Sequence, residues 1–276
     1  MNPIRFYKMS GCGNDFIIID NRSPVIEEKD LSAFIVGVCR RKMSVGADGI
    51  ILIENSDTVD FKWRFYNSDG SVAEMCGNGA RCVARFAYLN GIAGSDMSFE
   101  TLAGVVSASV SETGLVKIKM TDPLNLKLDY PLHLRGGEFL ISSVNTGVPH
   151  AVMVVDKIDQ TPVKEMGKEI RFHPDFAPAG TNANFVSVQP DKIVAVRTYE
   201  RGVEDETLAC GTGCVASALI TARKFALTSP VTLLTRSGGY LRIYFKLHQD
   251  TYSDVYLEGD ARVIYRAELC EDAWNY

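Results

Sequence analysis

The chain has 276 residues, of which 46% are hydrophobic and 23% are charged, and its formal net charge is -5. This length allows one large domain or two ordinary ones, and the apolar fraction excludes a disordered chain because it suffices for a core. The net negative charge argues against binding to nucleic acid. Since no apolar run is long enough to cross a bilayer, we expect no membrane association.

The seven cysteines are an odd number, which favours reduced thiols in the cytoplasm over a disulfide framework. Residues 1–6 also lack the apolar core of a signal peptide. The cysteine spacings do not match those of a zinc site, so no metal is expected. Cys82 and Cys214 are predicted to lie in helices, within the core. The cysteines expected to be structural are Cys12, Cys39 and Cys270.

The predicted elements follow the same order twice along the chain. In the first half, apolar residues at helical spacing predict a helix that ends near Asn90-Gly91. The strands predicted in this half are Phe16–Ile19, Ile50–Ile53, Lys62–Tyr66, Val105–Val110 and Val116–Met120. In the second half a helix is expected around Val215 to Ala222. The strands predicted there are Ala151–Val155, Asn184–Val188, Ile193–Tyr199, Val231–Thr235, Leu241–Leu247 and Val255–Glu258.

One offset along the chain, the separation of Cys76 and Cys210, relates several landmarks and indicates an internal repeat. The matched residues are Gly13 and Gly147, Gly46 and Gly180, the turns Cys76-Gly77-Asn78-Gly79 and Cys210-Gly211-Thr212-Gly213, Thr101 and Thr235, and Gly104 and Gly238. We therefore predict an α+β fold of two pseudo-symmetric halves, each a mostly antiparallel sheet curved around a central helix, with the active site in the cleft between them. The linker is expected at Asp122-Pro123-Leu124, so the halves would span residues 1–122 and 123–261. Residues 262–276, with the strand-like run Arg262–Leu269, would return to the first half.

The strongest chemical signal is the pair of Cys-Gly-x-Gly turns, each directly before a predicted helix. Backbone N–H groups and the positive end of the helix dipole at such a start favour an anion and lower the pKa of a thiol. Two such turns facing each other would place Cys76 and Cys210 on opposite sides of one carbon that bears a carboxylate. One thiolate would remove the α-proton and the opposite thiol would protonate the other face, while N–H groups hold the enediolate.

At these residues the sequence resembles diaminopimelate epimerase, a cofactor-independent isomerase of lysine and peptidoglycan precursor synthesis, over nearly the whole chain. The stretches that carry the resemblance, besides the cysteine turns, are Gly13-Asn14-Asp15-Phe16, Gly46-Ala47-Asp48, Tyr66-Asn67-Ser68-Asp69-Gly70-Ser71, His173-Pro174-Asp175-Phe176 and Tyr199-Glu200-Arg201-Gly202. The resemblance implies that Cys76 and Cys210 interconvert LL- and meso-diaminopimelate as a base and acid pair. It implies no pyridoxal phosphate and no other cofactor, and a small amino acid as the substrate.

The resemblance also implies roles for further residues. His150 and Glu200 would lie near the cysteines and bias their protonation. The substrate-binding residues would be Asn14, Asn67, Gly77, Asn78, Asn182, Glu200, Arg201, Gly211 and Thr212. Among these, Arg201 suits a distal carboxylate and Glu200 an ammonium group. The run Arg262–Tyr265 resembles a segment that pairs subunits in the family, so a homodimer is expected.

One departure from the family pattern concerns Val148, which stands in Gly147-Val148-Pro149-His150 where the family has Gly-Asn-Pro-His. Because valine cannot hydrogen-bond the distal head of the substrate, we expect weaker distal recognition and broader specificity. The alternative on the same scaffold is a racemase of another acidic amino acid such as glutamate, or an isomerase related to proline racemase or phenazine-biosynthesis proteins. Alternatives of another class are a non-catalytic amino-acid-binding protein and a thiol redox protein.

Overall fold

The computed structural model describes residues 4–276, which form two compact units. Residues 1–3, at the start of the segment expected to lack an export signal, lie outside the described residues. The first unit comprises the chain up to Ile118 together with Gly259–Tyr276, and the second comprises Lys119–Glu258. The chain therefore passes from one unit to the other twice, each time a few residues before the boundary expected from the sequence.

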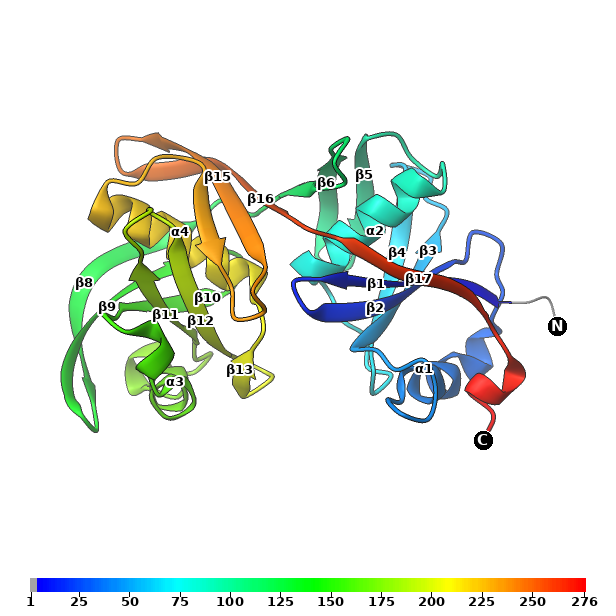
Figure 1. The fold of residues 1–276 in the computed structure, drawn as a ribbon, viewed down its shortest axis with the longest axis horizontal. Coiled ribbons are helices and arrows are strands. Elements are labelled where there is room, and N and C mark those ends of the chain that lie inside the picture. Colours follow the sequence, from blue (N-terminus) through cyan, green and yellow to red (C-terminus); the bar gives the residue numbers. More distant parts are fainter. Residues whose placement is uncertain (1–3) are drawn as a thin grey trace. The chain divides into compact units, whose positions relative to one another are not determined.

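The first unit is a mixed sheet in which the last strand of the chain lies beside the first (Figure 1). Its strands are β1 (Ile4–Gly11), β2 (Asn14–Asp20), β3 (Gly49–Glu54), β4 (Phe61–Asn67), β5 (Asp96–Thr101), β6 (Gly104–Val110), β7 (Val116–Lys119), which ends where the second unit begins, and β17 (Arg262–Leu269). Successive pairing gives the order β17-β1-β2-β3-β4-β5-β6-β7. The pairs β2/β3 and β4/β5 are parallel, and the other pairs in this order are antiparallel.

The second unit repeats this arrangement. Its strands are β8 (Leu124–Leu134), β9 (Gly137–Asn145), β10 (Pro149–Val154), β11 (Asn182–Val188), β12 (Val194–Glu200), β13 (Asp205–Thr207), β14 (Val231–Leu234), β15 (Tyr240–His248) and β16 (Thr251–Gly259). Pairing runs in the order β8-β9-β10-β11-β12-β14-β15, and β13 pairs with the end of β12. The parallel pairs are β10/β11 and β12/β14, which correspond to the parallel pairs of the first unit.

In each unit the central strands are covered on both faces by helices. In the first unit, α1 (Leu31–Cys39) packs with Ile17, Ile19, Ile50 and Leu52 in one core cluster. The alternate residues Phe16 and Ile51 lie on the other face, against Gly79 of α2 (Gly77–Leu89). Side chains alternate across a strand, so burial on both faces explains why these runs are apolar at every position.

The second unit has the same two-sided cover. Here α3 (Val163–Arg171) packs with Met153 and Phe185, while Asn184, on the opposite face of β11, lies against Gly213 of α4 (Gly211–Phe225). Figure 1 shows α3 and α4 on opposite sides of β10 to β12. The short 3-10 turns are Glu28–Asp30, Ile158–Gln160, Pro174–Phe176 and Glu271–Ala273.

Matched glycines of the repeat share the same unusual backbone. Gly46 has φ +70 and Gly180 has φ +67, a conformation that side chains rarely adopt. A Cβ at Gly46 would meet the Cα of Arg41 at 3.0 Å, and one at Gly180 would meet the carbonyl of Arg171 at 2.7 Å. At the same place in both units, a glycine therefore allows the segment that leads into β3 or β11 to pass close to the backbone at or just after the end of α1 or α3.

The α+β fold with two repeated halves confirms the prediction from the sequence. The helices α1 and α3, however, were not among the predicted elements, and neither were β1, β5, β8, β9 and β13. The segment Leu31–Cys39 is apolar almost throughout, so helical periodicity is weak, and α3 contains Gly167 within a short run. Tertiary packing against a sheet stabilises both helices where local propensity is insufficient.

Candidate active site

Cys76 is the N-cap of α2, with an extended backbone at φ -145 and ψ 118. The helix begins with a 2.8 Å hydrogen bond from the Ala80 N–H to the Cys76 carbonyl. The Cys76 side chain makes no capping bond to its own helix. Gly79 sits in the first turn, where a Cβ would lie 3.1 Å from Ile51 Cδ1. The glycine thus allows the helix start to lie close against β3.

Cys210 occupies the same position at the start of α4, with φ -108 and ψ 113. The Cys214 N–H donates to the Cys210 carbonyl at 2.9 Å, and the Cys210 thiol lies 3.6 Å from the Thr212 hydroxyl. Gly213 is more tightly confined than its counterpart. A Cβ there would be 2.4 Å from Asn184 Oδ1 and 3.3 Å from Cys210 Sγ. Cys210 is buried, whereas Cys76 is partly exposed.

Each cysteine turn has the features of an anion-binding helix start. The first-turn N–H groups of a helix have no partner inside the helix, and the dipole places positive charge at that end. A carboxylate bound there would lie beside the cysteine of the same turn. Within each unit, therefore, one thiol lies at a helix start of the kind that can bind an anion.

The other cysteines differ from these two in their surroundings. Burial raises the pKa of Cys12 to about 11 and that of Cys39 to about 12, so both remain thiols at neutral pH. Burial also raises the pKa of Cys82, which lies within α2 and is completely buried. Cys214 is buried in α4 as predicted, and Cys270 is exposed. All seven thiols are free of disulfides.

A hydrogen bond links Cys76 to a predicted substrate-binding residue, Asn14. The Cys76 thiol donates to Asn14 Oδ1 at 3.4 Å, and Asn14 Nδ2 donates to Asp48 Oδ2 at 2.6 Å. The Asp15 N–H donates to the same Asp48 oxygen at 3.1 Å. Because a carboxylate only accepts hydrogen bonds, Asp48 fixes which end of the Asn14 amide faces it, and the carbonyl end then faces Cys76.

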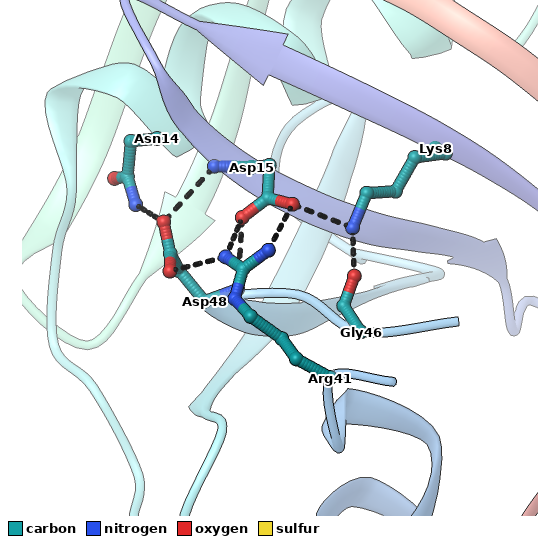
Figure 2. A network of polar contacts seen from close by, with 6 residues as sticks. All are labelled: Lys8, Asn14, Asp15, Arg41, Gly46 and Asp48. Atoms are coloured by element: carbon teal, nitrogen blue, oxygen red, sulfur yellow. Dashed lines mark hydrogen bonds and ion pairs between the residues drawn. The ribbon is translucent and has the colours of Figure 1, made fainter. Parts of the chain in front are cut away.

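Asp48 is part of an ion-pair network below Asn14 (Figure 2). Arg41 contacts Asp15 at 2.6 Å and Asp48 at 2.8 Å, and the buried Lys8 contacts Asp15 at 2.7 Å. Lys8 also donates to the Gly46 carbonyl. Burial acts to raise the pKa of Asp15, but hydrogen bonds from Arg41 and Lys8 outweigh it, and the pKa is lowered. The network ties the β1–β2 turn to the loop before β3, and so holds Asn14 in place.

Two further predicted residues of the first unit make local contacts. Asn67 is exposed at the end of β4, and its Nδ2 donates to the Ser71 hydroxyl at 2.9 Å. Asn78 is buried in the first turn of α2, and its Oδ1 accepts from Arg81 at 2.9 Å. The fully buried Arg81 also donates to the Asp260 carbonyl at 3.0 Å. It therefore connects the helix start that carries Cys76 to the chain segment before β17.

In the second unit, Asn182 joins two predicted site residues. Its Nδ2 donates to the Pro149 carbonyl at 3.0 Å, next to His150, and its Oδ1 accepts from the Arg201 N–H at 2.8 Å. The Arg201 guanidinium donates to the Ala179 carbonyl at 3.2 Å. Asn182 thus supports the backbone around His150 and Arg201, and part of its hydrogen-bonding capacity is used in doing so.

Two residues were expected to bias the protonation of the cysteines. His150 is buried and Glu200 is partly buried. Burial lowers the pKa of His150 to about 3, and the positive charge of Arg201 acts in the same direction, so the imidazole is neutral at pH 7. Burial raises the pKa of Glu200 above its usual range. Any influence of His150 on a thiol therefore comes from hydrogen bonding, since the ring carries no charge.

Sequence reasoning missed several residues that support these groups. Lys8, Arg41, Arg81 and Asn184 were not singled out, although each bonds to a predicted residue or to its neighbour. A charged residue such as Lys8 or Arg81 inside an apolar strand or helix is the signal that could have found them, because such charges are buried only when paired. Arg41, in contrast, is exposed in a turn and carries no such signal.

Within residues 4–276, no group of His, Cys, Asp and Glu side chains is arranged to hold a metal ion. In the same range, no helix is long and apolar enough to span a membrane.

The chain matches the family model described as diaminopimelate epimerase over residues 6–126 and 142–264. It is 46% identical to the diaminopimelate epimerase of Aquifex aeolicus, over 99% of this chain and all of that protein. It is 42% identical to the diaminopimelate epimerase of a Hydrogenobaculum species, over 95% of this chain and 97% of that protein.

Solved structures similar to this chain share its fold at low identity. A PhzF-family phenazine biosynthesis protein of Bacillus anthracis has a TM-score of 0.76 at 15% identity, covering 98% of this chain and all of that one. A probable proline racemase of Agrobacterium radiobacter has a TM-score of 0.69 at 15% identity, covering 99% and 94%. These likenesses show the fold alone.

Proposed function

The chain belongs to the diaminopimelate epimerase family, and from this membership we propose that Cys76 and Cys210 are the acid and base groups of its reaction. The enzyme is an isomerase that interconverts LL- and meso-diaminopimelate, in lysine biosynthesis. The comparisons give no support to the alternative of a glutamate racemase. The observation that carries the proposal is that both cysteines begin repeat-related helices at glycine-rich turns.

In the proposed reaction, one cysteine acts as a thiolate and takes the proton from the α-carbon of the substrate. The electron pair of the broken C–H bond passes into the carboxylate, which becomes an enediolate. The thiol of the other cysteine then gives its proton to the opposite face of the carbon. The configuration is inverted, and the two sulfurs have exchanged their protonation states. No step requires an electron acceptor or a cofactor.

The proposed role of the helix starts is to stabilise the enediolate. Backbone N–H groups of Gly77 and Asn78 in one turn, and of Gly211 and Thr212 in the other, bind the α-carboxylate. Donors that are already oriented toward developing negative charge cost no reorganisation during the reaction, and removing one such donor elsewhere costs about 10²–10³ in rate. The small residues of these turns permit close approach of the carboxylate.

The remaining proposed contacts hold the rest of the substrate. Arg201 binds the distal carboxylate and Glu200 the distal ammonium group, while Asn14, Asn67 and Asn182 supply amide groups. The bonds described above support this assignment for Asn14, whose carbonyl faces Cys76, and for Asn182, which supports Arg201.

The two-cysteine proposal is tested by Cys76→Ala and Cys210→Ala. We expect each substitution to lower epimerisation about 10³-fold or more, because each removes one proton carrier. The measurement is solvent deuterium incorporation at the α-carbon of diaminopimelate, with stereochemical analysis of the product. Cys270→Ala, at an exposed thiol, is the control and should keep wild-type activity. Full activity in either single variant of the proposed pair would remove the mechanism, and neither a binding protein nor a redox protein would label the carbon.

Val148 provides a test of substrate strictness. Since the family pattern has asparagine at this position, Val148→Asn would restore a hydrogen-bonding side chain beside the distal head. We expect kcat/KM for diaminopimelate to rise about five- to tenfold, consistent with a net hydrogen bond of about 1 kcal/mol. Val105→Asn, on an exposed strand position of the first unit, is the control. An unchanged kcat/KM in Val148→Asn would indicate that the valine does not weaken recognition.

We propose the cytoplasm as the compartment and a homodimer as the assembly. The odd number of cysteines, seven, favours a reducing compartment over a disulfide framework. In β17, the large apolar side chains of Ile264 and Tyr265 are exposed, which favours contact with a second copy along this strand. Sedimentation of the wild type and of Ile264→Glu would decide the assembly, with the variant expected to be monomeric.

A further inference from the structure

A chain of buried hydrogen bonds crosses the second unit behind His150. The Thr198 hydroxyl donates to Asn184 Oδ1 at 2.9 Å, and Asn184 Nδ2 lies 3.1 Å from His150 Nδ1. Asn184 Nδ2 also donates to the Ala151 carbonyl at 2.9 Å. Asn184, His150 and Thr198 are all at most 3% exposed. None of these bonds is needed to explain the sheet, whose backbone pairs are already complete between β10 and β11.

The orientation of the Asn184 amide is determined by its backbone contact. A carbonyl oxygen can only accept a hydrogen bond, so the end of the amide that faces Ala151 must be the NH₂ group. The same NH₂ group faces His150 Nδ1, and its second hydrogen is directed there. The other end of the amide is the oxygen, which accepts from Thr198. If the two ends of the Asn184 amide were exchanged, its oxygen would face the Ala151 carbonyl oxygen, and neither atom could donate a hydrogen bond.

This orientation determines the protonation of the imidazole. Nδ1 must accept from Asn184, so it carries no proton, and a neutral ring then carries its proton on Nε2. Protonation of Nδ1 would place two donors against each other. Nε2 is buried and, among the described residues, has no hydrogen-bond partner in the structure. An N–H donor is therefore held ready for an acceptor that a ligand would bring.

We propose that Asn184 is a positioning residue that keeps His150 neutral with its proton on Nε2, so that His150 is a hydrogen-bond donor and not an acid or base. Asn184 also adjoins the second cysteine turn, because a Cβ added at Gly213 would be close to both Asn184 Oδ1 and Cys210 Sγ. The importance of this donor for epimerisation rests on the function proposed above. The protonation state of the ring does not.

The surroundings of His150 contain few groups that could change its charge. Its cross-strand neighbours are Val144 on β9 and Asn182 on β11, and neither ionises. The ionisable groups on adjoining segments include Glu200, the last residue of β12, Arg201 directly after it, and Cys210 at the start of α4. Burial and Arg201 both lower the pKa of His150, in agreement with the acceptor role of Nδ1.

The proposal is tested by side-chain ¹⁵N NMR of the wild-type enzyme without substrate. The chain has four histidines, and loss of one signal set in His150→Gln assigns the resonances. We expect His150 to show a protonated Nε2, an unprotonated Nδ1 and no titration between pH 5 and 8. A ring that titrates in this range, or that carries its proton on Nδ1, would overturn the proposal. This result does not depend on whether the cysteines react.

A variant extends the test to activity. In Asn184→Asp the donor becomes a carboxylate, so Nδ1 gains an acceptor and the pKa of His150 should rise by about two units or more, as for other groups beside an opposite charge. The pH profile of kcat should then show an added ionisation that follows the NMR titration. Thr198→Ser keeps the hydroxyl and should leave the pKa of His150 and the pH profile of kcat unchanged. If Asn184→Asp does not fold, the wild-type spectrum alone decides; if it folds with an unshifted His150, Asn184 is not the residue that sets the protonation state.

Discussion

At the scale of single residues, the two cysteines have different neighbours although they occupy equivalent positions. Cys76 is partly exposed and donates to Asn14, whereas Cys210 is buried beside Thr212. The first arrangement depends on Asp48, because this carboxylate holds the NH₂ end of Asn14 and turns the carbonyl end toward the thiol. The Asp48 side chain, which lies beyond the proposed substrate contacts, therefore determines which atom of Asn14 the Cys76 thiol faces.

The ion pair of Lys8 and Asp15 predicts a pH-dependent stability. The pKa of folded Asp15 is lowered below its usual 3.8, so its contribution is fully present above that value and is lost as the pH falls through the folded pKa. Lys8→Met should cost about 3 kcal/mol of unfolding free energy at pH 7, as for other buried pairs that lose one partner. The difference in unfolding free energy between Lys8→Met and the wild type should become smaller at a pH at which Asp15 is protonated.

Urea unfolding at pH 7 and below pH 4 would measure this effect. Lys62→Met is the matched control, because Lys62 is more exposed and lies 3.8 Å from Glu54. It should change the unfolding free energy by less than about 1 kcal/mol. If both substitutions changed the unfolding free energy equally at pH 7, the buried pair of Lys8 and Asp15 would not stabilise the fold more than the exposed pair does.

At the scale of elements, the first turn of each central helix contains a glycine that lies close against the sheet. The approach is tighter in α4, where Asn184 Oδ1 occupies the space in which a side chain at Gly213 would lie. A glycine at this position thus serves a packing requirement, besides any role of its N–H group. The neighbouring Gly211 has ordinary space, since its Cβ would lie 3.4 Å from Leu257 Cδ1.

This difference predicts unequal effects of two alanine substitutions in one helix turn. Gly213→Ala should lower the unfolding free energy by about 1–3 kcal/mol, as expected for overpacking, and should displace Asn184. Gly211→Ala should be close to neutral or slightly stabilising, because alanine favours a helix over glycine. Thermal or urea unfolding of both variants gives the comparison. The reverse order of effects would contradict the packing argument.

At the scale of the whole molecule, the first unit is built from both ends of the chain. β17 pairs with β1 over most of its length, and Arg81 and Arg85 of α2 donate to the Asp260 and Ala261 carbonyls. Trp274 packs edge-on against Phe34 of α1. The chain end is therefore part of the core and of the support of the Cys76 helix.

Removal of the chain after Arg262 should destabilise the first unit selectively. β1 would lose its hydrogen-bonded neighbour on one side, and Phe34 would lose its aromatic partner. Limited proteolysis with mass spectrometry should show cleavage within the first unit before the second. Removal of Tyr276 alone, which is more than half exposed, is the control and should leave the digestion pattern unchanged. Equal protection of the truncated chain would contradict this role of β17.

The sequence by itself determined the repeat and the positions of the central helices, with Cys76 and Cys210 directly before them. These features are local: glycine spacing, helical periodicity and a cysteine before a helix start can be recognised within short windows. The outer helices α1 and α3 could not be predicted in this way, since their stability comes from packing against strands distant in the chain.

Only the tertiary structure decided which side chains support the site. Arg41 and Asp15 are separated by α1 in the sequence, and their ion pair exists because β2 lies beside β3 and so brings the β1–β2 turn to the segment before β3. The contact between Asn184 and His150 likewise follows from the register of β10 and β11. Hydrogen-bond direction and burial depend on such long-range pairing, and a sequence pattern contains no information on them until the strands are placed.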